Sequence, residues 1–69
     1  MQDQTWIENR MLQYVIDQKQ VFMLNLRNQF AGFSPDTVEL AINSLIDTNR
    51  MITKHDEFGR EFAYPGPAR

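Results

Sequence analysis

Residues 33–51, FSPDTVELAINSLIDTNRM, constrain the fold most, because they predict one amphipathic helix with a defined start. Ser34 is a favourable N-cap and Pro35 suits the first helical position. Asp36 lies in the first turn, where the helix dipole favours negative charge. Apolar residues then recur with the 3.6-residue period of a buried helix face: Val38, Ala41, Ile42, Leu45 and Ile46. We therefore expect a helix that packs this face against the rest of the chain.

The segments before this helix predict two more helices. The first is expected from about Gln4 to Gln18, with an apolar face that includes Ile7, Met11, Leu12 and Val15. Residues 21–24, VFML, are short and β-prone, and they leave two readings open: a single bridging strand or the opening of the second helix. Residues 24–30 continue with a helical pattern, and Gly32 is expected to end it.

After residue 50 the apolar period changes from 3.6 to two, which predicts a β-hairpin. The segments MITKH and REFAY are the expected strands, and the DEFG segment between them supplies Gly59, which is able to take a positive φ. Ile52 and either Phe62 or Tyr64 are expected to pack under the helices. The two prolines of PGPAR cannot extend a strand ladder, so residues 65–69 are expected to form a flexible tail.

A chain of 69 residues predicts a single domain, with a core over about residues 5–64. The absence of Cys excludes disulfides and thiolate metal sites. The N-terminal residues are polar and acidic, without the apolar run of a signal peptide, and no apolar stretch approaches the ~20 residues of a membrane span. We therefore expect a cytoplasmic protein without a membrane segment.

The sequence offers little to support catalysis. His55 is the only His, so no site with two His ligands for a metal exists. Ser34 and Ser44 lack the G-x-S-x-G context of an activated serine, and the three glycines are isolated rather than grouped in a phosphate-binding loop. We expect a protein that is not an enzyme and that has no cofactor and no metal.

The order of helix, short strand, helix, turn, helix and hairpin resembles the winged helix-turn-helix family of DNA-binding domains, over about residues 5–64. The segment LNLRNQF resembles the first helix of the motif, AGFS the turn and PDTVELAINSLIDTNR the recognition helix, and MITKHDEFGREFAY resembles the wing. The resemblance implies a small α+β fold of three helices with a C-terminal two-stranded β-hairpin wing. It also implies a transcriptional regulator whose recognition helix enters the major groove of DNA.

The resemblance places six residues of the third helix toward a DNA groove: Pro35, Asp36, Thr37, Glu39, Leu40 and Asn43. Thr37 and Asn43 are the expected base readers, through a thymine methyl group and an adenine edge. Asp36 and Glu39 are able to accept hydrogen bonds from cytosine, but they repel phosphate. Leu40 is an apolar side chain on a face that should be polar, and a protein partner at Glu39 and Leu40 is the alternative that it favours.

Phosphate contacts would have to come from other residues, because the net charge of the chain is −2. Five residues flank the wing tip or bracket the motif and are the expected contacts: Arg27, Arg50, Lys54, His55 and Arg60. A homodimer, in contact through Trp6, Met11 and Tyr14, would double this set. Three functions stay open at this point: a DNA-binding regulator, a protein-interaction module that uses the acidic helix face without binding DNA, and a piece or subunit of something larger.

Overall fold

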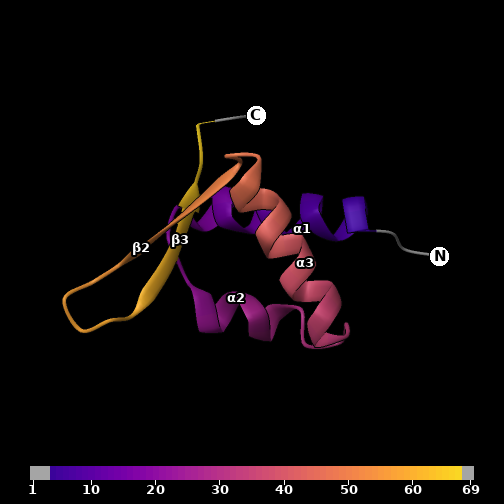
Figure 1. Cartoon of the computed structure of the whole chain (residues 1–69), viewed down its shortest axis with the longest axis horizontal. Coiled ribbons are helices and arrows are strands. Elements are labelled where there is room, and N and C mark those ends of the chain that lie inside the picture. Colours follow the sequence, from indigo (N-terminus) through magenta and orange to yellow (C-terminus); the bar gives the residue numbers. More distant parts are fainter. Residues whose placement is uncertain (1–3, 68–69) are drawn as a thin grey trace.

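The computed structural model describes residues 4–67, which form three helices and a three-stranded antiparallel sheet (Figure 1). The elements in chain order are α1 (Gln4–Gln18), β1 (Val21–Phe22), α2 (Met23–Gln29), α3 (Pro35–Asp47), β2 (Met51–His55) and β3 (Glu61–Pro65). The strands are arranged in the order β1-β3-β2, so the last strand of the chain lies in the middle. This small α+β layout is compatible with the expected winged-helix-like arrangement, in which the hairpin of β2 and β3 is the wing. None of the helices within residues 4–67 is long and apolar enough to cross a membrane.

The sheet has one strand more than expected, because residues 21–24 fulfil both of the readings that the sequence left open. Val21 pairs with Ala63 and Phe22 pairs with Phe62, while Met23 already begins α2. The expected bounds of α1 are confirmed. The expected end of α2 is wrong: the helix stops at Gln29, three residues before Gly32.

The start of α3 is confirmed in detail. Pro35 is its first residue, and the hydroxyl of Ser34 accepts a hydrogen bond from the Thr37 backbone N–H at 3.2 Å. The helix ends at Asp47, and Asn49 takes a left-handed φ of 60° as the chain turns into β2. Ser34 therefore satisfies one of the backbone donors that an uncapped helix start would leave without a partner.

The core lies between the three helices and one face of the sheet. Its buried members are Ile7, Met11, Val15, Val21, Met23, Leu26, Phe30, Val38, Ala41, Ile42, Leu45, Met51 and Ala63. Met11 is fully buried, so the structure removes it from the expected dimer contact on α1.

The face of the sheet that packs against the helices is the opposite of the expected one. Met51 and Ala63 are fully buried, whereas Ile52, Phe62 and Tyr64 are half-buried on the other face. The register decides this: Ile52 lies opposite Tyr64, while Ala63 pairs with the buried Val21. Successive residues of a strand point to opposite faces, so a one-residue error in phase exchanges the two faces completely.

A buried ion pair joins α1 to the loop between α3 and β2. Glu8, only 7% exposed, accepts hydrogen bonds from Arg50 Nη2 at 2.6 Å and from Ser44 Oγ at 3.0 Å. Arg50 Nε also donates to Thr48 Oγ1 at 2.9 Å. Helix α1 thus meets α3 and the loop that follows it at one carboxylate, across 36 and 42 residues of sequence.

The start of the expected tail belongs to the fold. Pro65 is the last residue of β3, opposite Met51, and the buried Gly66 donates its N–H to the Arg50 carbonyl at 2.8 Å. Proline is tolerated at the end of a strand, where its missing N–H breaks no interior ladder bond. The prediction of a flexible tail is therefore wrong for residues 65–66. Residues 68–69 of the expected tail lie outside the described part of the chain.

Candidate functional site

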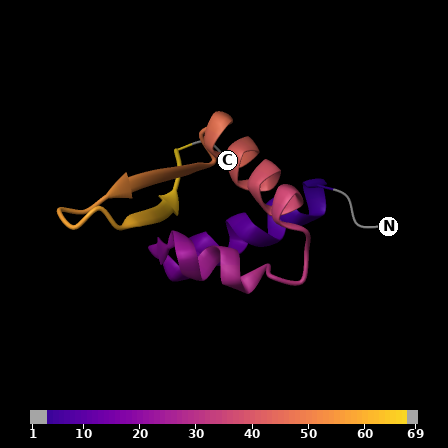
Figure 2. The ribbon, with the colours of Figure 1, turned by 60° about the horizontal axis from the view of Figure 1, so that its bottom comes forward.

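The outward side of α3 presents a row of four exposed residues that we call the α3 stripe: Asp36, Leu40, Asn43 and Asp47. Spacings of four, three and four residues place them on one side of the helix, opposite the buried side chains of α3. Leu40 is 57% exposed. Figure 2 shows α3 as an outer element, with α1 and α2 together on its other side. The stripe combines two carboxylates, an amide and one apolar side chain, and it contains no cation.

The structure separates the two expected base readers. Asn43 is exposed on the α3 stripe. Thr37 is half-buried at the start of the helix, where its hydroxyl lies 2.7 Å from the Ser34 hydroxyl. Pro35 and Glu39 turn toward α2 and do not share the stripe. Of the six residues expected to face DNA, only Asp36, Leu40 and Asn43 therefore lie together.

Glu39 and Arg27 form an ion pair between α3 and α2. Arg27 Nε lies 2.8 Å from Glu39 Oε2, and Nη2 lies 3.3 Å from Oε1, which is a two-point contact. The hydrogen bond from Arg27 lowers the pKa of Glu39, and the same contact raises the pKa of Arg27. Arg27, which was expected to contact phosphate, and Glu39, which was expected to contact a protein partner, thus neutralise each other.

Arg50 is also engaged within the fold, since it is the partner of the buried Glu8. A phosphate contact from Arg50 would leave that carboxylate buried without its counter-charge, which is costly. Both arginines that bracket the motif are therefore already ion-paired within the fold.

The cations of the wing lie on its outer face, away from the α3 stripe. Lys54 Nζ is 5.4 Å from the centroid of the Tyr64 ring, and the Arg60 guanidinium is 5.8 Å from that of Phe62. Arg60 Nε also forms an ion pair with Asp56 Oδ2 at 2.6 Å. His55 occupies the other side of β2, with Nε2 3.9 Å from Glu61 Oε2. Within residues 4–67, Lys54 is the one residue of the expected DNA-contact set that is cationic and makes no ion pair.

A mainly apolar hollow of about 430 Å³ lies beside the ion pair, between α2 and α3. Phe30, Phe33, Pro35 and Val38 contribute its apolar lining. The sequence did not predict this hollow, because Phe33 was assigned to a turn and Pro35 to the start of a helix. Two aromatic residues three positions apart and close to a proline, Phe30, Phe33 and Pro35, were the feature of the sequence that could have indicated an apolar surface here.

Neither a metal-binding cluster nor a relative identifies this surface. Within residues 4–67 no group of three or more His, Cys, Asp or Glu side chains could hold a metal ion. Comparison of the chain with protein families, curated proteins and solved structures gives no match. The function must therefore be argued from the chemistry of the surface itself.

Proposed function

We propose that this chain is a winged-helix module that binds another protein through the α3 stripe, with Leu40 as the anchor. The observation that carries the proposal is the exposure of Leu40 in the middle of an acidic helix face that contains no cation. Duplex DNA carries a negative charge about every 1.7 Å of its axis, so Asp36 and Asp47 would be repelled by it. A protein surface has no such charge requirement.

The stripe indicates the chemistry of the partner. Full burial of a leucine side chain contributes about 1.5–3 kcal/mol, so a partner that covers the exposed half of Leu40 would gain about 1 kcal/mol there. Asp36 and Asp47 are eleven residues apart, or about 16 Å along a helix. A complementary surface would place an apolar side chain between two Lys or Arg residues separated by about that distance.

Duplex DNA is the second candidate, and one observation favours it. Lys54 is exposed and without an ion pair among the described residues, on a hairpin that reaches away from the helices (Figure 2). The wing is the element that the resemblance assigns to the DNA backbone. Binding of this kind would depend on the wing, and on a second copy of the chain to add positive charge.

Two matched variants separate these functions. Leu40→Lys adds a charge to the α3 stripe, and Leu24→Lys adds one to α2, at a leucine that is 56% exposed. If the stripe binds protein, partners captured by the wild type and by Leu24→Lys are lost with Leu40→Lys. If it binds DNA, Leu40→Lys strengthens duplex binding and Leu24→Lys does not. Retention of the same partners by all three proteins would refute the proposal.

A titration of labelled protein with duplex DNA at low salt completes the test. Amide shifts over residues 36–43 and 54–60 that disappear with added salt would establish the DNA interface, because phosphate contacts release counterions and weaken steeply with salt. The proposal expects no such shifts at millimolar DNA. Thermal unfolding of each variant checks that the fold is retained.

A further inference from the structure

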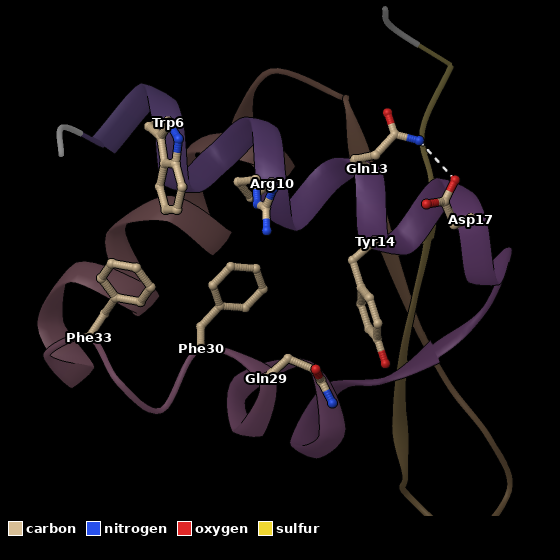
Figure 3. A pocket seen from close by; sticks show the side chains of 8 residues that line it. All are labelled: Trp6, Arg10, Gln13, Tyr14, Asp17, Gln29, Phe30 and Phe33. Atoms are coloured by element: carbon tan, nitrogen blue, oxygen red, sulfur yellow. Dashed lines mark hydrogen bonds between the residues drawn. The ribbon is translucent and has the colours of Figure 1, made fainter.

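A second hollow, of about 410 Å³, lies between the outer side of α1 and the turn from α2 into α3 (Figure 3). Three aromatic rings line one end of it. The Trp6 and Phe33 centroids are 6.0 Å apart, and those of Phe30 and Phe33 are 6.2 Å apart, with the rings tilted in both pairs. A hollow of this volume, with rings for walls and a few polar groups, has the size and composition of a small-molecule site.

Arg10 supplies the positive charge of this hollow. Its guanidinium lies 5.4 Å from the centroid of the Trp6 ring, and Figure 3 shows Arg10 beside Trp6 and above Phe30. No carboxylate within residues 4–67 forms an ion pair with it. Contact with an aromatic face holds a guanidinium in one orientation and leaves its N–H donors available.

The remaining polar groups make the hollow asymmetric. Asp17 is the acid in its lining, two helical turns from Arg10 on α1, and it accepts a hydrogen bond from Gln13 Nε2 at 2.8 Å. Figure 3 shows this pair at the far end of the hollow, beyond Tyr14. The end with the aromatic rings is therefore positive, and the opposite end is negative.

We propose that this hollow binds a small planar aromatic carboxylate. The aromatic ring of the ligand packs against Trp6 and Phe30, in the offset or tilted contacts that such rings prefer. Its carboxylate pairs with Arg10, whose planar fork matches the two oxygens. This site is separate from the α3 stripe and does not depend on what that stripe binds.

Trp6 provides the readout, because it is the only tryptophan of the chain and gives one indole N–H signal. The probes are 1-naphthoate and its neutral analogue 1-naphthamide. We expect naphthoate to shift the Trp6 indole signal and the amides of residues 29–33, and to bind about tenfold more tightly than the amide, as for a hydrogen bond to a charged group.

Two variants test the two charges of the hollow, and a third is a control. Arg10→Gln should reduce naphthoate binding to the level of naphthamide, and Asp17→Asn should leave it unchanged or strengthen it. Lys54→Gln removes a cation on the wing and should have no effect. Equal binding of the two probes, unchanged binding by Arg10→Gln, or no shift at millimolar naphthoate would each overturn the proposal. The amide spectrum of each variant shows at the same time that it is folded.

Discussion

Replacement of Arg50 by Met would leave Glu8 as a buried carboxylate without its counter-charge. Removal of one partner of a buried ion pair costs about 3–5 kcal/mol, and we expect the lower end, because the Arg50 side chain is 26% exposed and water would reach Glu8. A domain of 69 residues is stable by only about 3–10 kcal/mol in total. At about 4–8 °C per kcal/mol, a loss of about 3 kcal/mol lowers the melting temperature by about 12–24 °C.

Thermal and urea unfolding, followed by circular dichroism, would measure this loss. Arg60→Met is the matched control: it breaks the exposed pair with Asp56 and should cost much less stability than Arg50→Met, because exposed ion pairs contribute little. Glu8→Gln introduced into Arg50→Met should recover stability, because the amide has no charge to leave unpaired and can still accept from Ser44. A cost below about 1 kcal/mol for Arg50→Met, or additive losses in the double variant, would refute this reasoning.

Three further predictions concern stability. The hydrogen bond from Arg27 holds the pKa of the half-exposed Glu39 below the ordinary value of 4.5, so the stabilisation is present above that pH and is lost as the pH falls through the lowered pKa. Glu39→Gln should therefore cost about 0.5 kcal/mol in urea unfolding near pH 6, and progressively less as the pH falls below 4.5. Lys19 has a left-handed φ of 68° at the end of α1, so Lys19→Gly should raise the free energy of unfolding by about 0.5–1 kcal/mol. A methyl group at Gly66 would overlap the Asn49 carbonyl, so Gly66→Ala should cost about 1–3 kcal/mol in thermal unfolding, whereas Gly32→Ala, which meets open space, should not.

The sequence predicts the elements whose signals are local. The cap at Ser34 and the proline after it predict the start of α3, because both act within one helical turn. Strand β1 could not be predicted firmly, since two residues are too few to show a period. The prediction of which hairpin face meets the helices was wrong. Met51 and Ile52 are both apolar, as are Phe62 and Ala63, so the sequence pattern fits either face. Only the pairing with β1 decides which of these residues face the helices.

The candidate site was less predictable, because it depends on which charges meet. Arg27 and Glu39 are twelve residues apart, and Glu8 and Arg50 are 42 apart, so no local pattern shows that these cations are already paired. A count of basic residues in the sequence therefore overstates the number of cations that are available to contact phosphate. The exposed Leu40 did stand out in the sequence, because an apolar residue interrupts an otherwise polar face.

The strand order also determines when the sheet can form during synthesis of the chain. Strand β3 is made after β1 and β2, yet it is the middle strand and the partner of both. Until residues 61–65 leave the ribosome, neither β1 nor β2 has a strand to pair with, although α1, α2 and α3 are already complete. Part of the apolar surface of the helices therefore stays uncovered until residues 61–65 complete the sheet that packs against them.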